Sequence, residues 1–195
     1  MNRKLVCVSL IPCALLFACS KQDAAVPPSA SAPVAAPAQP EALPAPTGQA
    51  ASASIQGIGD SPVSGNLQFT TLSQGVRVTG EITGLTQGKE QGIHIHELGD
   101  CSGPDGMRAG AHFNPGNNPH GAPTDAAHHL GDLSNLEPDS MGTAKVDQLI
   151  ANATLHDAGV NDLIGRSVVI HMQRDDYKTQ PAGDSGSRVA CGVIM

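Results

Sequence analysis

Two histidines two residues apart, His94 and His96, have a spacing that could bind a metal. They alternate with two isoleucines, which is the period-two pattern of a β-strand, and side chains at i and i+2 of a strand point to the same face. Both imidazoles would therefore face one site. The pattern indicates a pair of metal ligands, and its alternative is an exposed polar strand face.

The other candidate ligands lie further along the chain. A long segment rich in Gly, Pro, Asn and His, residues 99–129, contributes three histidines, and Asp132 follows it. Three imidazoles and one carboxylate complete a closed tetrahedral set, which is how proteins hold structural zinc. His171, on a later strand, could join the first pair, because sets of imidazoles suit oxidised copper. The three histidines of the segment are His112, His120 and His129.

Short β-strands must position these side chains. The chain has no Trp, one Tyr and three Phe, so its core must be built from Val, Ile, Leu and Ala, of which the β-branched types favour strands. We predict an all-β fold, a Greek-key barrel or sandwich of antiparallel strands, with a turn at Gln74-Gly75. Two long loops, residues 99–129 and 173–187, would build the site. Apolar residues alternate in segments 63–69, 76–82, 144–150, 168–170 and 189–193.

The N-terminus is typical of an exported protein. Two basic residues precede an apolar run, residues 5–17, that is too short to cross a bilayer, and we interpret residues 1–18 as a signal peptide. The run ends in LFAC, which resembles a bacterial lipoprotein box, so Cys19 would be lipidated and become the new N-terminus. The alternative is a plain cleavage site with an incidental cysteine.

Residues 19–53 form the lipidated N-terminus and a tether, and residues 54–195 form the domain. The tether consists mainly of Ala, Pro, Ser and Gln without periodicity, so it should stay extended, either to hold the domain away from a membrane or as a linker without a role. The net charge of -7 and the lack of a basic stripe exclude a nucleic-acid partner. We expect a periplasmic or cell-envelope protein that meets the membrane only through its lipid.

Cys101 and Cys191 are the only cysteines after residue 19. An even pair of cysteines in an oxidising compartment suggests a disulfide. The alternative is two unpaired thiols in the core.

Five spaced motifs give the chain a family resemblance. In this order they resemble the motifs of the copper/zinc superoxide dismutases, and the similarity covers essentially all of residues 54–195. The resemblance implies that the protein dismutates superoxide to oxygen and hydrogen peroxide with copper and zinc as cofactors. The motifs are GIHIHE (92–97), GAHFNP (110–115), HG (120–121), HLGDL (129–133) and GSRVACGVI (186–194).

The resemblance also assigns roles to individual residues. Asp175 matches a carboxylate that hydrogen-bonds ligands of both metals, and Arg188 matches the arginine that receives the anion above copper. Cys101 and Cys191 match the family's disulfide. His112 would bridge the two metals and act in catalysis with Arg188. The implied ligands are His94, His96, His112 and His171 for copper, and His112, His120, His129 and Asp132 for zinc.

Two rival functions fit part of the pattern. A domain of this fold could buffer or deliver copper without dismutating superoxide, or zinc could merely stabilise a surface lipoprotein. The complete set of copper histidines, together with Arg188, favours an enzyme that protects the cell envelope. His128 and His156 match no ligand and are expected to be solvated. The sequence leaves a homodimer open.

Overall fold

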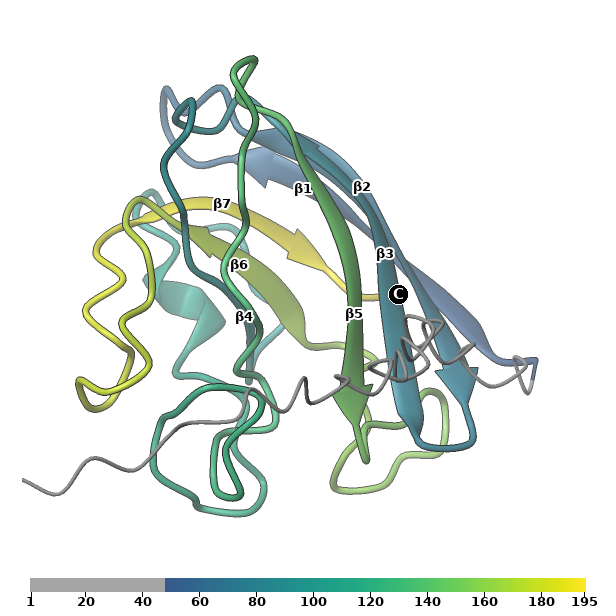
Figure 1. The fold of residues 1–195 in the computed structure, drawn as a ribbon. Coiled ribbons are helices and arrows are strands. Elements are labelled where there is room, and N and C mark those ends of the chain that lie inside the picture. Colours follow the sequence, from purple (N-terminus) through teal and green to yellow (C-terminus); the bar gives the residue numbers. More distant parts are fainter. Residues whose placement is uncertain (1–47) are drawn as a thin grey trace, which may run out of the picture. The chain divides into compact units, whose positions relative to one another are not determined.

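Seven β-strands build the part of the chain that the computed structural model describes, residues 48–195 (Figure 1). The predicted signal peptide, the lipidation site Cys19 and most of the tether lie outside these residues. Within residues 48–195, no helix has the length and apolar character needed to cross a membrane. The elements are β1 (Ala50–Gly57), β2 (Ser64–Leu72), β3 (Gly75–Thr83), β4 (Ile93–His96), the short 3-10 helix η1 (Met107–Ala109), β5 (Ala144–Ala151), β6 (Ser167–His171) and β7 (Arg188–Val193).

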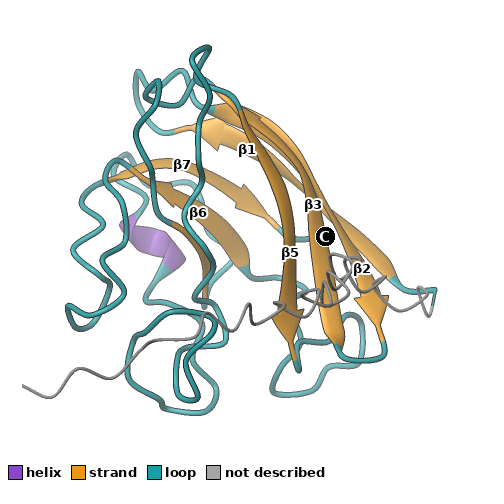
Figure 2. Cartoon of the chain, in the orientation of Figure 1, coloured by secondary structure: helices purple, strands orange, loops and turns teal. Residues whose placement is uncertain are grey.

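The strands form one curled sheet in the order β4-β6-β7-β1-β2-β3-β5. Every neighbouring pair is antiparallel, and strands that follow each other in sequence, such as β3 and β4, do not always pair. The prediction of an all-β antiparallel fold is therefore confirmed. Figure 2 shows long loops on the side of the sheet that carries β6. The turn between β2 and β3 is at Ser73 and Gln74, and Gly75 already belongs to β3.

Strand β1 begins at Ala50, so it includes residues 50–53, which composition alone assigns to the tether. Small residues alternate here, with Ala51 and Ala53 buried and the serines exposed. Ala53 pairs with Leu67 of β2 in the sheet. The period-two pattern is present, but alanine and serine make it resemble low-complexity sequence.

Branched aliphatic side chains fill the core, as the near absence of aromatic residues predicts. In β4, Ile93 and Ile95 belong to this core and are fully buried. Because side chains alternate along a strand, His94 and His96 lie on the opposite face. The core therefore fixes the strand that carries the first two candidate ligands.

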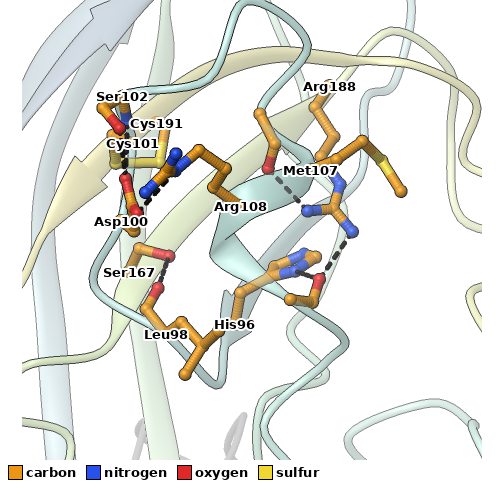
Figure 3. Close-up of a disulfide and its surroundings, with 12 residues drawn as sticks. His96, Leu98, Asp100, Cys101, Ser102, Met107, Arg108, Ser167, Arg188 and Cys191 are labelled. Carbon is orange, nitrogen blue, oxygen red and sulfur yellow. Dashed lines mark hydrogen bonds and ion pairs between the residues drawn. A yellow bond between two sulfur atoms is a disulfide. The ribbon is translucent and has the colours of Figure 1, made fainter.

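A disulfide joins Cys101 to Cys191, which ties the loop of residues 99–129 to β7 (Figure 3). The two cysteines are 90 residues apart in sequence. A cross-link of this span restricts the unfolded chain strongly, because it removes the entropy of a long open loop. The predicted pairing is confirmed.

Replacing both cysteines with serine is expected to lower the free energy of unfolding by about 4 to 5 kcal/mol, because the loop-closure entropy returns to the unfolded chain. The measurement is urea unfolding of the metal-free protein, followed by circular dichroism. Wild-type protein reduced with dithiothreitol serves as the control and should unfold at the same urea concentration as the variant. Equal midpoints for the variant and the oxidised wild type would contradict the prediction.

Candidate metal centre

Four buried histidines converge on one site. His94 and His96 come from β4, His171 ends the neighbouring β6, and His112 comes from the long loop. The loop reaches the strand through a β-bridge that pairs His112 with His96. One ring nitrogen from each of these histidines lies within 4.8 Å of those of the other three. The structure thus brings together the four residues that the sequence assigns to copper.

One nitrogen of each ring is held by a hydrogen bond, and the other is free to bind a metal. The free atoms are Nδ1 of His94 and Nε2 of the other three, all buried and without a partner. An unpartnered buried polar atom ordinarily costs about 1–3 kcal/mol, so four such nitrogens directed to one place are suited to binding a shared metal ion. Neutral imidazole nitrogens are ligands that copper prefers, so these residues fit that ion. The fixed nitrogens bond to Asp175 Oδ2 (His94 Nε2, 2.7 Å), Gly110 O (His96 Nδ1, 3.0 Å), Asp132 Oδ1 (His112 Nδ1, 2.8 Å) and Gly186 O (His171 Nδ1, 3.2 Å).

Burial keeps these four rings neutral. It lowers the pKa of His171 to about 3 and that of His112 to about 4. Burial likewise lowers the pKa of His94 and His96 below the ordinary histidine value. A neutral imidazole has a lone pair on its second nitrogen, which is the form that binds a metal.

A second group surrounds Asp132. Its Oδ1 lies 2.8, 3.0 and 3.2 Å from the Nδ1 atoms of His112, His120 and His129. Its Oδ2 accepts hydrogen bonds from the backbone N–H groups of Gly121 and His129. Three nitrogens and a carboxylate at this spacing fit the closed donor set of a structural zinc.

Hydrogen bonds and ion pairing, rather than burial, determine the charges of Asp132 and His120. Burial raises the pKa of Asp132, but the bonds to its three histidines outweigh this effect and hold the pKa well below the usual range. Burial lowers the pKa of His120, and the carboxylates of Asp132 and Asp175 outweigh it and raise the pKa to about 9. The carboxylate is therefore ionised and ready to bind a cation.

Asp175 connects the two groups. Its Oδ2 accepts from His94 Nε2 at 2.7 Å, and its Oδ1 accepts from His120 Nε2 at 2.9 Å. The side chain is fully buried, and the backbone N–H of Tyr177 donates to Oδ1 as well. One carboxylate thus orients a ring in each group.

Arg188, the first residue of β7, is fixed near His96 (Figure 3). Its Nη1 donates to Gly106 O and its Nη2 donates to Gly110 O, each at 2.7 Å. The carbonyl of Gly110 also accepts from His96 Nδ1. The guanidinium is therefore one carbonyl away from a candidate copper ligand.

Comparison with known proteins agrees with this geometry. The family model "Copper/zinc superoxide dismutase (SODC)" matches residues 63–194. A superoxide dismutase [Cu-Zn] of Onchocerca volvulus is 40% identical over 143 residues, which are 68% of this chain and 88% of the relative. That of Saccharomyces cerevisiae is 40% identical over 144 residues, 70% of this chain and 92% of the relative. The crystal structure of a SOD-like protein from Bacillus subtilis matches with a TM-score of 0.68 and 31% identity, over 74% of this chain and 97% of its own.

The chain belongs to the copper/zinc superoxide dismutase family. Membership confirms the predictions that the protein is an enzyme, a superoxide dismutase, and that copper and zinc are its cofactors. Superoxide is the substrate that this family implies.

The two other histidines of the dismutase domain belong to neither ligand group. His128 Nδ1 donates to the carbonyl of His129, and His156 Nε2 donates to the carbonyl of Ala50. Neither ring is directed to the centre by these bonds. His156 is exposed, as predicted for a solvated residue, whereas His128 is half-buried.

Some residues that shape the centre have no signal in the sequence. Gly183 has a φ of 65°, and a Cβ atom there would collide with Asp175 Oδ1 and His120 Nε2. Only glycine leaves room for the carboxylate to reach that ring. The side-chain amides of Asn135 and Gln180 also contact residues of the centre. Spacing does not distinguish them from the other Asn, Gln and Gly residues of the loops.

Proposed function

We propose that the enzyme is an exported dismutase in which the ring of His112 is shared between copper and zinc. The observation that carries this proposal is the membership of His112 in both ligand groups, with Nε2 free toward one and Nδ1 directed to Asp132 in the other. The copper ligands would be His94, His96, His112 and His171, and the zinc ligands His112, His120, His129 and Asp132.

The side chains around the centre orient the metal ligands, and one of them can carry a proton to the product. When bound, copper supplies the redox couple that accepts an electron from one superoxide and gives it to a second, while zinc has no redox chemistry. His112 can hold a proton at Nε2, the atom without a protein partner, while Nδ1 keeps its direction toward Asp132. This proton and a second one from water would go to the peroxide product, so that two superoxide ions and two protons give oxygen and hydrogen peroxide.

Arg188 would receive the substrate. Superoxide is an anion and the chain has a net charge of -7, so the overall charge opposes the encounter. A fixed local cation reverses this effect at short range, because solvent and salt screen the more distant charges. The two carbonyl bonds of Arg188 hold the guanidinium in place without neutralising it.

Export to the periplasm or cell envelope, with a lipid on Cys19, completes the proposal. It is supported by the basic and apolar residues at the start of the chain and by the disulfide, which persists in oxidising compartments. A relative that is 38% identical over 141 residues, 68% of this chain and 69% of its own, is an extracellular superoxide dismutase of Brugia pahangi. An enzyme in that compartment would remove superoxide outside the cytoplasm.

The test is a superoxide-consumption assay on the purified exported chain in metal-free, zinc-only, and copper-plus-zinc forms. We expect background decay in the first two forms and catalysis in the third, with one copper and one zinc per chain by elemental analysis. Full copper uptake without catalysis would instead support the copper-buffering module. Uptake of zinc without copper would reject the proposed ligand sets.

A further inference from the structure

One side-chain amide holds both backbone polar groups of a zinc-group histidine. The backbone N–H of His120 donates to Gln180 Oε1 at 2.8 Å, and Gln180 Nε2 donates to His120 O at 2.8 Å. The two residues are 60 positions apart, so the contact joins the loop of residues 173–187 to that of residues 99–129. We call this paired contact the Gln180 clamp.

A second side-chain amide makes the same kind of paired contact. Here the amide belongs to the segment before β5, and its backbone partner belongs to the loop of residues 173–187. The backbone N–H of Asp175 donates to Asn135 Oδ1 at 2.8 Å, and Asn135 Nδ2 donates to Asp175 O at 2.9 Å. The N–H of Asn135 in turn donates to Tyr177 Oη at 2.7 Å. This Asn135 clamp fixes the backbone of the carboxylate that connects the two ligand groups.

The two clamped residues are bonded to each other through their side chains. His120 Nε2 lies 2.9 Å from Asp175 Oδ1, and His120 Nδ1 lies 3.0 Å from Asp132 Oδ1. The orientation of the His120 ring thus depends on the positions of two backbone segments, the one that carries His120 itself and the one that carries Asp175. Neither segment belongs to a strand or helix of the described chain, so no sheet ladder fixes them.

An amide is the side-chain group suited to this task. A backbone residue offers one donor and one acceptor, and only Asn and Gln present a donor and an acceptor side by side on a neutral group. A carboxylate of the same size can accept a hydrogen bond from the backbone N–H. Its second oxygen is also an acceptor, so it cannot donate to the backbone carbonyl. The paired contact is therefore lost on a change from amide to acid that leaves the side chain's shape unchanged.

We propose that Gln180 and Asn135 are positioning residues that set the zinc affinity of the centre, by holding the backbones of His120 and Asp175 through paired hydrogen bonds. The inference rests on the proposed assignment of His120 to zinc. Groups that orient metal ligands typically change metal affinity by ten- to a hundredfold when they are altered. These two residues act one step further out, on the backbone from which the ligand and its acceptor extend.

The variants Gln180→Glu and Asn135→Asp test the proposal. Each is expected to raise the zinc dissociation constant roughly ten- to a hundredfold, measured by competition with a chromophoric chelator. Cobalt bound in place of zinc should show a changed visible absorption spectrum, because the ligand geometry changes. The matched control is Gln148→Glu, since Gln148 makes the same paired contact with Ser134, at 2.8 and 3.0 Å, and Ser134 is in neither ligand group.

Thermal unfolding of each metal-free variant shows whether it folds. If Gln180→Glu does not fold, Gln180→Met provides the same test, because it removes both bonds without adding a charge. Zinc constants and cobalt spectra equal to wild type in folded variants would overturn the inference, and so would an equal loss in Gln148→Glu. Failure of the wild type itself to bind zinc would be a different result, which rejects the proposed function.

Discussion

Replacing His112 with alanine is expected to reduce superoxide consumption to the uncatalysed background. Its ring is the one side chain among the described residues that belongs to both ligand groups, so the change removes a nitrogen from each. A copper site left with three histidines loses its link to the second group, and the proton carrier at Nε2 disappears with it. The measurements are the rate of superoxide decay and the copper and zinc contents after reconstitution with both ions.

Two further histidine variants make the result specific. His156→Ala should keep the full rate, because His156 donates to Ala50 O and belongs to neither ligand group. His129→Ala should lose zinc but retain copper and part of the rate, because it leaves the four copper histidines intact. Full activity and both metals in His112→Ala would show that the shared ring is not needed.

The sequence predicts the centre well where a ligand lies on a strand. The alternation of Ile93 and Ile95 with His94 and His96 predicts one face in the core and one at the site, and the structure has this arrangement. Here the hydrophobic effect fixes the strand, and the strand fixes the side-chain direction. The motifs around residues 110–115 and 129–133 add the loop ligands through family resemblance rather than through periodicity.

The sequence predicts less where the backbone is irregular. The role of Asp175 was suggested only by resemblance, because its carboxylate reaches His94 and His120 through a loop whose path has no periodic pattern. The Asn135 and Gln180 clamps were not predicted at all, since amides are common in loops and their partners are distant in sequence. Strand β1 has no counterpart among the predicted strand segments, because its small alternating residues carry a weak hydrophobic signal, and the predicted domain boundary at residue 54 falls inside it.

Arg188→Glu is expected to lower the second-order rate roughly ten- to a thousandfold, the range found for charge-steered encounters, superoxide dismutases included. The change replaces a cation fixed beside His96 with an anion, in a chain whose net charge is already -7. Salt should slow the wild type, because it screens attraction, and should accelerate the variant, because it screens repulsion. The measurement is the rate across a series of ionic strengths, with copper content determined in parallel.

Arg188→Lys separates charge from geometry. Lysine keeps the positive charge but not the planar fork that donates to Gly106 O and Gly110 O together. The lysine variant should therefore keep the wild-type sign of the salt effect while losing part of the rate. Within the described residues, the hydrogen bonds of Arg188 go to two backbone carbonyls and to no ligand side chain, so both variants should retain their copper. A slow variant with full copper would then separate substrate attraction from metal binding. Equal rates for Arg188→Glu and the wild type at low ionic strength would show that Arg188 does not supply the attracting charge.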